Sequence, residues 1–444
     1  MIKNKLNKMT RKKQFLYFCI LIVLCLYPAI DGYTEKVYID ITSPYSRKIP
    51  VVIGRVEMEG TPARPDLPEK MRIVMNDDLD FSGFFIVRKN ENTKDNAFTI
   101  EQNILKWKKE GVSLFVASKV LNSSGKMAVE FRLYDVVEER FIVGRRYNGR
   151  EEDYERMAHR FCDEILDQIS GIRGPFETRI AYVSEKKGIR NLIISDYNGK
   201  NPKVVTNCKS IMTTPIWSSD GSKVIYNAYR NGKSALYIVD LVSGTEKKVN
   251  VPGSLCLPGD WSPDGSKVAI TLSIDGNSDI YLLDVATGKV SNITKSRYIE
   301  VSPTWSPDGK KIAFNSNRHG TPQIFVIDLS SSDVKRITYS GNYNTSPDWS
   351  PNGDKIVFTA KTGDKFDIAM ISPAGNGIKY LTSNSGDNES PSWSPDGRYI
   401  VFTSSREGEY KIFVMTADGG NQRKIGTSGG KEITPHWSPY RYSH

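Results

Sequence analysis

Short apolar runs recur at a fixed interval through the second half of the chain. Each repeat holds two runs of β-branched and aromatic residues, such as 268–272 and 280–284, bounded by Gly, Pro, Asn or Asp. This pattern favours β-strands. A tryptophan followed by Ser-Pro-Asp-Gly, or a close variant, marks a further strand and a tight turn. The tryptophans stand 44 residues apart, at Trp217, Trp261, Trp305, Trp349, Trp393 and Trp437.

The six repeats predict a six-bladed β-propeller. A weaker fourth run, which often ends in Thr, brings each repeat to four strands, the number in one blade. The six tryptophans are expected to pack between blades. The strand at 179–184 precedes every tryptophan strand, and the last tryptophan strand lies close to the end of the sequence. We therefore expect these two strands to pair and to close the ring without an exposed edge.

Residues 33–172 lack the repeat and alternate between strand and helix patterns. Candidate strands lie at 36–41, 50–56, 84–87, 112–121, 127–135 and 141–147, and candidate helices at 67–79, 100–109 and 151–169. Such alternation predicts a small α/β or α+β domain. Gly171 to Pro175 read as a linker. The predicted fold is mixed, with an N-terminal α/β domain at 33–172 and an all-β propeller at 173–444 that is closed by its N- and C-terminal strands.

The first 32 residues read as a secretory signal peptide. Six basic residues precede an apolar run from Phe15 to Tyr27, and small residues follow it. An uncleaved membrane anchor is the alternative, although the run is shorter than a membrane span. This segment carries six positive charges and one negative, so its removal would change the net charge from +10 to +5. That surplus does not call for a nucleic acid partner, and no nucleic-acid-binding motif is present.

The sequence offers no catalytic or metal-binding constellation. Gly426 to Gly430 match G-x-S-x-G, but a nucleophile elbow needs a strand-to-helix turn with acid and His downstream, whereas this match falls in a predicted loop between blades. The four histidines show no zinc-hydrolase spacing. Cys162, Cys208 and Cys256 are widely spaced and odd in number, which favours packed thiols. We therefore expect a non-enzymatic protein without a cofactor or a metal.

Three stretches outside the repeat add a resemblance to a known family. They are the junction Gly171–Gly174 with Phe176–Val183, the run Ser195–Gly199, and the ending Trp437–Tyr440. With the propeller repeat, they make the chain similar to the TolB family, periplasmic propeller proteins of the Tol-Pal system of Gram-negative bacteria. The resemblance implies a periplasmic, monomeric protein that binds the lipoprotein Pal and the inner-membrane protein TolA. Its implied role is in outer-membrane integrity and constriction at cell division.

Candidate partner sites follow from the repeat and from the resemblance. Loops that enter the innermost strands should line one mouth of the channel and vary between blades, as binding loops do. The Pal-binding candidates four to six residues before the tryptophans are Met212, Leu255, Glu300, Val301, Asn344, Asn388, Glu389 and Glu432. The TolA-binding candidates, in a strand suited to addition at a partner's sheet edge, are Val37, Tyr38, Ile39, Asp40 and Ile41.

Two departures from the expected patterns and two other functions stay open. Ser43–Lys48 is bulky and basic for the family, and Pro258-Gly259 replaces the proline that other repeats place two residues before tryptophan. One alternative is an exported propeller that binds a small ligand or a metal, which a ring of inward aspartates would favour. The other is a propeller related to peptidase-gating domains but lacking a hydrolase domain, in which case a peptidase assay should be blank.

Overall fold

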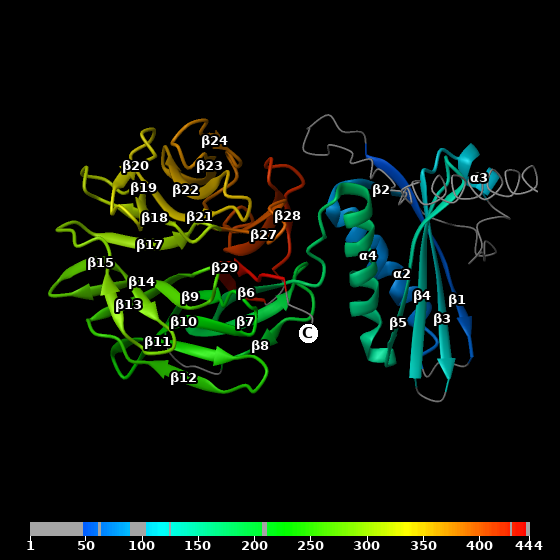
Figure 1. Ribbon diagram of the computed structural model, residues 1–444, viewed down its shortest axis with the longest axis horizontal. Coiled ribbons are helices and arrows are strands. Elements are labelled where there is room, and N and C mark those ends of the chain that lie inside the picture. The colour runs from blue at the N-terminus through cyan, green and yellow to red at the C-terminus, as the bar shows by residue number, and fades with distance from the viewer. Residues whose placement is uncertain are drawn as a thin grey trace, which may run out of the picture. The chain divides into compact units, whose positions relative to one another are not determined.

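The computed structural model describes residues 48–60, 64–88, 104–123, 126–206, 211–426 and 429–440 (Figure 1). The predicted signal peptide and the predicted strand at 36–41 lie outside these residues. Within them, no helix is both long enough and apolar enough to cross a membrane.

The N-terminal part is built on one mixed five-stranded sheet. Its strands are β1 (Ile49–Glu59), β2 (Phe85–Arg88), β3 (Leu114–Ser123), β4 (Lys126–Asp135) and β5 (Arg140–Gly149). They lie in the order β2-β1-β3-β4-β5, with β1 parallel to both of its neighbours and the β3-β4-β5 meander antiparallel. The five strands predicted in the described part of this domain are confirmed within a few residues at each end.

Helices cover both faces of this sheet. The helices α2 (Leu67–Ser82) and α4 (Tyr154–Ser170) share one core with its first face, and α3 (Ile104–Lys109) packs through Trp107 against the other face (Figure 1). One 3-10 turn, η2 (Glu151–Asp153), precedes α4 where a single helix was predicted. Gly171 ends α4 with φ of 71°, a left-handed conformation that suits glycine.

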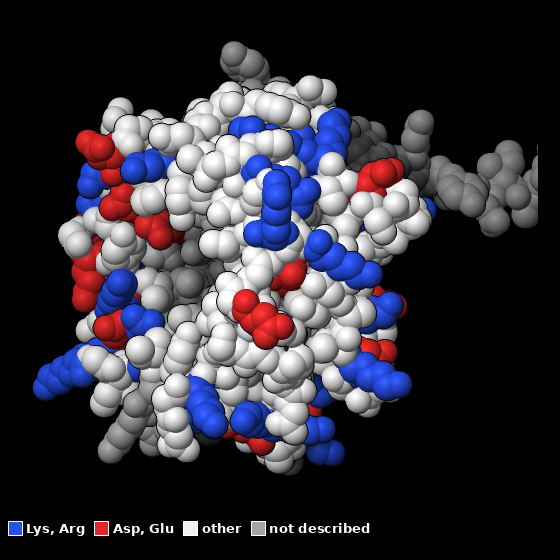
Figure 2. All heavy atoms as spheres, turned by 90° about the vertical axis from the view of Figure 1, so that its left-hand side faces the viewer, with Lys and Arg blue, Asp and Glu red and all other residues white. Residues whose placement is uncertain are grey.

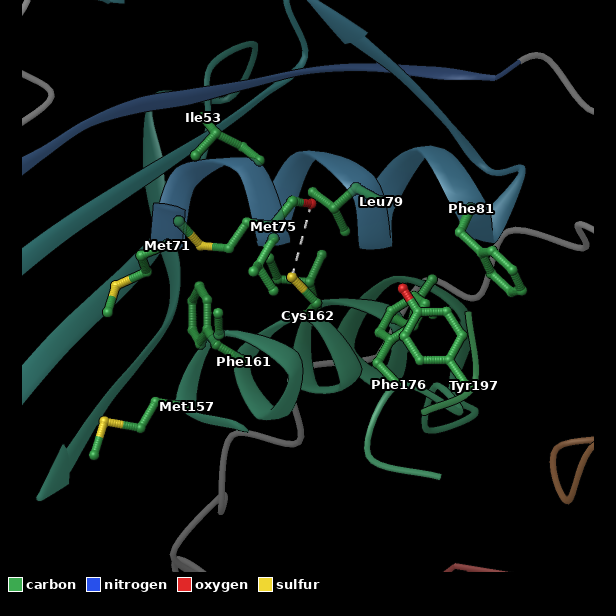
Figure 3. Close-up of a cluster of buried hydrophobic side chains, with 14 of the residues drawn as sticks. Ile53, Met71, Met75, Leu79, Phe81, Met157, Phe161, Cys162, Phe176 and Tyr197 are labelled. Atoms are coloured by element: carbon green, nitrogen blue, oxygen red, sulfur yellow. Dashed lines mark hydrogen bonds between the residues drawn. The ribbon is translucent and has the colours of Figure 1, made fainter. Parts of the chain in front are cut away.

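The core between α2, α4 and the sheet is closely filled by long apolar side chains. Figure 3 shows Met75 and Leu79 of α2 facing Phe161 and Cys162 of α4. The rings of Phe131 and Phe161 stack with centroids 4.9 Å apart. Cys162 and Cys256 are buried free thiols, as predicted, whereas Cys208 lies outside the described residues. Buried thiols of this kind act as small apolar side chains.

The second part is a propeller of six four-stranded antiparallel blades (Figure 1). The first blade combines β6 (Arg179–Lys186), β7 (Ile189–Asp196) and β8 (Lys203–Val204) with β29 (Lys431–Trp437). The second to fourth blades consist of β9 (Met212–Trp217), β10 (Lys223–Arg230), β11 (Lys233–Asp240), β12 (Glu246–Val249); β13 (Leu255–Trp261), β14 (Lys267–Ile274), β15 (Asn277–Asp284), β16 (Val290–Asn292); and β17 (Glu300–Trp305), β18 (Lys311–Ser316), β19 (Gln323–Asp328), β20 (Val334–Arg336). The last two consist of β21 (Asn344–Trp349), β22 (Ile356–Thr362), β23 (Lys365–Ile371), β24 (Lys379–Tyr380); and β25 (Asn388–Trp393), β26 (Tyr399–Ser404), β27 (Lys411–Thr416), β28 (Arg423–Lys424).

The Ser-Pro-Asp-Gly turn works through its side chains as well as its backbone. In the third blade, Ser262 Oγ donates to Asp264 Oδ1 at 2.6 Å and accepts from the backbone N–H of Lys267 at 2.9 Å. Gly265 supplies the positive φ of 72° that the turn needs. The same contacts recur at Ser218 and Ser306. This local chemistry explains why the turn sequence is kept almost unchanged from blade to blade.

The ring closes as the sequence predicts. Strand β29 pairs antiparallel with β6, with Lys431 opposite Glu185 and Trp437 opposite Ile180. The indole N–H of Trp437 donates to Thr178 Oγ1 at 2.8 Å, which adds a side-chain contact to the seam. The two ends of the propeller chain therefore complete one blade, and no strand edge is left open there.

The α/β domain and the propeller share one apolar core. Tyr197 and Tyr399 of the propeller lie in the same buried cluster as Phe81 of α2. The Tyr197 hydroxyl donates to Asp78 Oδ1 at 2.5 Å, and the Tyr399 hydroxyl donates to the Ser82 carbonyl at 2.9 Å. Both hydroxyls are thus satisfied inside the core, as buried tyrosines require.

Candidate protein-binding face and channel of the propeller

The innermost strands enclose a narrow channel of about 210 Å³. Five of the six strands line it with a Ser or Thr followed by Pro, and the residue after the proline lines it as well. The Ser and Thr residues are Thr214, Ser302, Ser346, Ser390 and Thr434. The repeat therefore gives the channel a wall of hydroxyl groups and proline rings.

These five Ser and Thr residues all have a left-handed backbone, with φ between 47° and 56°. Such a φ is uncommon for any residue other than glycine and is strained for a β-branched threonine. In each case the pairing register with the neighbouring strand shifts at this point, as between Val301 and Thr304. Every one of these innermost strands therefore bends at the same place, and the bend repeats around the channel.

The third blade departs from this rule at Pro258-Gly259, the pair that the sequence singled out. A Cβ atom on Gly259 would lie 2.4 Å from Pro303 Cγ and 2.5 Å from the Pro303 carbonyl oxygen of the next blade. Contacts that short do not occur between real atoms, so the approach of the two blades requires glycine here.

The side chain directly before each tryptophan links neighbouring blades. In five of six blades it accepts a hydrogen bond from the backbone N–H of the next blade's tryptophan. The pairs are Trp305 N to Asp260 (2.8 Å), Trp349 N to Thr304 (3.2 Å), Trp393 N to Asp348 (2.7 Å), Trp437 N to Ser392 (3.2 Å) and Trp217 N to His436 Nδ1 (3.4 Å). Ile216 occupies this position in the sixth case. The tryptophans themselves are buried between blades, as predicted.

Three of these linking side chains titrate, and burial shifts each pKa. Burial and the nearby Asp348 carboxylate raise the pKa of Asp260 to about 7. Burial raises the pKa of Asp348 to about 6 and lowers the pKa of His436 to about 4. The two aspartates occupy two of six equivalent positions, so they do not form the ring of inward aspartates that would favour a metal-binding propeller. Among the described residues, no three His, Cys, Asp or Glu side chains are grouped as metal ligands.

The predicted mouth residues lie in strands, so their assignment to loops is wrong. Each one belongs to the first half of an innermost strand, from Met212 in β9 to Glu432 in β29. Five of their side chains are fully buried, namely Met212, Glu300, Asn344, Asn388 and Glu432, while Leu255, Val301 and Glu389 are partly exposed. A buried side chain cannot contact a partner directly, which leaves the partly exposed three as direct candidates.

The buried polar members of this set form hydrogen bonds and ion pairs within and between blades. Glu300 accepts from Ser316 Oγ at 3.2 Å and pairs with Arg318. Asn344 donates to Gln323 Oε1 at 2.9 Å and to the Ser340 carbonyl at 3.0 Å. These contacts engage Glu300 Oε1 and the Asn344 amide N–H groups, whereas Glu300 Oε2 and Asn344 Oδ1 are buried without a hydrogen-bond partner among the described residues.

Sequence reasoning missed the exposed residues that lie one position earlier. Ile211, Ile299 and Tyr343 precede the buried Met212, Glu300 and Asn344, and their exposed fractions are 56%, 53% and 38%. Neighbouring residues in an extended chain point in opposite directions, so a shift of one position exchanges buried for exposed. The sequence therefore did hold a signal for the exposed face, namely a large apolar residue six positions before the tryptophan in three of the repeats.

These residues lie on the face where the innermost strands begin and the β14–β15 hairpin turns. Figure 2 looks onto that side of the molecule, and it shows a hollow with Lys, Arg, Asp and Glu side chains of both signs around it. Exposed apolar side chains with charged neighbours are typical of a protein-binding face.

The remaining sequence candidates fall outside the described residues. These are the segment Val37–Ile41 and, within the G-x-S-x-G match, Thr427 and Ser428. Among the described histidines, His159 Nδ1 lies 2.8 Å from Asp78 Oδ2 in the shared core. The other oxygen of Asp78 accepts from the Tyr197 hydroxyl, so both carboxylate oxygens are used within the fold.

An α/β domain joined to a closed six-bladed propeller with a narrow channel defines a class of two-domain propeller proteins. Two family models match the two parts: "TolB amino-terminal domain" over residues 37–142 and "TolB beta propeller domain" over residues 166–441. Because the second match alone covers more than half of the sequence, the chain belongs to the TolB family.

Relatives and one solved structure agree with this assignment. The chain is 36% identical to the Tol-Pal system protein TolB of Desulfosudis oleivorans over 236 residues, which is 52% of this chain and 53% of that one. It is 38% identical to the Tol-Pal system protein TolB of Geobacter metallireducens over 49% of this chain and 50% of that one. The matched region thus spans about half the length of these curated relatives. The crystal structure of TolB from Acinetobacter baumannii matches with a TM-score of 0.79 and 26% identity, over 89% of this chain and 98% of that chain.

Proposed function

We propose that this protein is a non-enzymatic, periplasmic component of a Tol-Pal system. It binds Pal on the propeller face defined by Ile211, Ile299 and Tyr343, and it binds TolA through the segment Val37–Ile41. In this role it connects Pal at the outer membrane with the inner-membrane TolA complex, for outer-membrane integrity and constriction at division. The first 32 residues act as its signal peptide, with the α/β domain at 33–172 and the propeller at 173–444.

The observation that carries this proposal is the propeller face itself. Strand ends there place large apolar side chains in solvent, while the residues next to them are buried and hydrogen-bonded. A rigid ring that presents exposed apolar side chains is suited to a protein partner, because their burial supplies binding free energy without reordering the backbone. The relatives named as Tol-Pal system proteins supply the identity of that partner.

The decisive experiment measures binding to Pal from the same organism. The chain without its first 32 residues is titrated with the periplasmic domain of Pal by isothermal calorimetry, and a 1:1 complex is expected. Replacing Tyr343 or Ile299 by Ala should weaken it by about 1 kcal/mol or more each. The control is Val242→Ala, at an exposed residue in the turn after β11, and it should leave the affinity unchanged. If the unaltered protein forms no complex with Pal, the proposal fails.

The TolA contact is tested separately. Deleting residues 33–41 should abolish binding to TolA and leave Pal binding intact. Loss of both contacts, or of neither, would contradict the division of the two sites between the N-terminal segment and the propeller.

A further inference from the structure

Arginines occur at one equivalent position in alternate blades of the propeller. Arg230, Arg318 and Arg406 are spaced by two repeats, and Arg318 and Arg406 lie in the hairpins that follow β18 and β26. Those hairpins adjoin the starts of β17 and β25, because Glu300 pairs with Ser316 and Asn388 with Ser404. They therefore lie on the face where Ile299 is exposed.

Arg318 and Arg406 have matching surroundings, which makes each a control for the other. Arg318 donates from Nε to Ser316 Oγ at 3.1 Å and lies over the Phe325 ring at 4.9 Å. Arg406 donates from Nε to Ser404 Oγ at 2.8 Å and lies over the Phe413 ring at 4.5 Å.

The two sites differ in charge compensation. Arg318 forms an ion pair with the buried Glu300, and Arg230 forms one with Glu246. At Arg406 the place of Glu300 is taken by Asn388, whose Oδ1 accepts from Nη2 at 3.0 Å. Among the described residues, no carboxylate forms an ion pair with Arg406. Burial lowers the pKa of Arg406, although the carboxylates of Glu407 and Asp367 act in the opposite direction.

The two carboxylates that act on the charge of Arg406 have other partners. Glu407 pairs with Lys424 at 2.5 Å, and Asp367 accepts from Thr382 Oγ1 at 2.8 Å and from Asn388 Nδ2 at 3.4 Å. The guanidinium is thus half-buried, with a positive charge that neutral oxygens hold in position.

The site is also rigid. Gln422 Oε1 accepts from Arg406 Nη1 at 2.8 Å, while Gln422 Nε2 donates to the Gly419 carbonyl at 2.8 Å. Asn388 Oδ1 accepts from Ser404 Oγ at 2.7 Å. Arg406 thus donates to Ser404, Gln422 and Asn388, which uses three of the five N–H groups of its guanidinium. Two N–H groups are left for a ligand. A fixed, partly desolvated guanidinium is well suited to a carboxylate, because such charge-assisted hydrogen bonds are strong and directional.

We propose that Arg406 is the receptor for an aspartate or glutamate side chain of the protein partner that docks on this face. The inference rests on the proposed docking of Pal there. It also gives Asn388 a role different from the one expected: Asn388 does not touch the partner but positions the guanidinium, and its lack of charge keeps the guanidinium available.

The first test needs no partner. Asn388→Glu restores in the sixth blade the carboxylate that the fourth blade has at Glu300. With Arg406 present, we expect this change to raise the melting temperature by about 1–3 °C, whereas in the Arg406→Met background it should lower it. An equal effect in the two backgrounds would show that Arg406 has no unmet capacity for an anion, and would overturn the inference whatever the partner does.

The second test measures affinity for the Pal periplasmic domain. Arg406→Met and Asn388→Glu should each weaken binding at least about tenfold, because each removes the free positive charge. Lys365→Met, which removes one positive charge from the hairpin of the fifth blade, is the control and should change affinity by less than about threefold. Unchanged affinity in the first two variants would overturn the docking role. If the unaltered protein forms no complex with Pal, the proposed function fails. The first test would still decide whether Arg406 has unmet capacity for an anion.

Discussion

At the scale of single residues, the channel wall combines strained backbone with buried titratable groups. Five Ser and Thr residues with positive φ bend the innermost strands, and in five of six blades the side chain before the tryptophan forms a hydrogen bond to the next blade. Residues with these properties were visible in the sequence only as a repeated Ser-Pro or Thr-Pro pair. Their strain could not be predicted, because a positive φ at Ser or Thr has no sequence signature of its own.

The aspartates of the channel should make stability depend on pH. A carboxyl group with a raised pKa in the folded state stabilises the fold below its unfolded pKa, and that contribution is lost as pH rises through the folded value. For Asp260 the window runs from about 4, the unfolded value, to about 7. Asp260→Asn keeps an acceptor for Trp305 N and removes the titration. Its stability relative to the unaltered protein should therefore improve by about 3–4 kcal/mol between pH 4 and pH 7.5.

This prediction is checked by urea unfolding across that pH range. Ser392→Ala, at the same position in the sixth blade, removes a linking side chain that does not titrate, so its effect should be the same at every pH. The pH dependence contributed by His436 has the opposite sign. Because its pKa is lowered in the folded state, the protein loses stability as pH falls below about 6.5, the pKa of an unfolded histidine. A flat pH profile for the Asp260→Asn difference would contradict the assignment of a buried, partly protonated carboxyl group.

Gly259 gives a second residue-scale prediction. Gly259→Ala would place a methyl group against Pro303 of the next blade, so it should destabilise the protein by about 1–3 kcal/mol through overpacking. Gly420→Ala is the control, because its Cβ would meet only the side chains of Thr416 and Asp418, at 3.2 Å or more. Both are measured by chemical denaturation, and equal losses would show that the contact between blades is not the cause.

At the scale of elements, the strands could be predicted because the 44-residue repeat gives six independent readings of the same pattern. The strand in blade four beginning near Glu300 is weak evidence alone, but it recurs at Asn344 and Asn388. The direction of individual side chains could not be predicted as well. Because period 2 alternation is interrupted by the bend at residues such as Ser302, counting from the tryptophan selected the buried Asn344 and not the exposed Tyr343.

The closing strand gives an element-scale prediction. A chain that ends before Gly429 lacks β29, which leaves β6 with an unpaired edge and removes the buried Trp437. We expect loss of more than about 3 kcal/mol and concentration-dependent association. Calorimetry and light scattering measure the two effects.

A synthetic peptide of residues 429–440 serves as the control for the truncation. Added in excess, it should restore part of the lost stability by pairing with β6 in trans. If the truncated chain is as stable as the full one, closure by β29 is not what holds the ring.

At the scale of the whole molecule, the two domains should unfold together. Phe81 of α2 packs edge-on against Tyr197 at 4.7 Å between ring centroids and lies 5.2 Å from Tyr399, so one core spans both domains. Scanning calorimetry should show a single transition. Phe81→Ala should split it into two, because it removes the ring that both propeller tyrosines contact. Phe314→Ala, within the fourth blade, should lower the transition temperature without splitting it.

This shared core lay beyond sequence reasoning for a physical reason. Phe81 reads as an ordinary apolar residue near a helix end, and Tyr197 and Tyr399 as ordinary members of turns beside strands. Their meeting depends on how two domains dock, which no local periodicity encodes. The family resemblance, by contrast, rested on the propeller repeat and on three short stretches, the junction at Gly171–Val183, the run Ser195–Gly199 and the ending Trp437–Tyr440.

The alternating arginines have a consequence for how a partner could be seated. A ring of six identical blades would bind a partner with equal affinity in six orientations, each related to the next by a rotation of one blade. Here Arg230 at the end of β10 and Arg318 after β18 each form an ion pair within the propeller. Among the described residues, Arg406 after β26 has no such ion pair. A partner with one matching acidic group would therefore bind this ring in a single rotational orientation about the propeller axis.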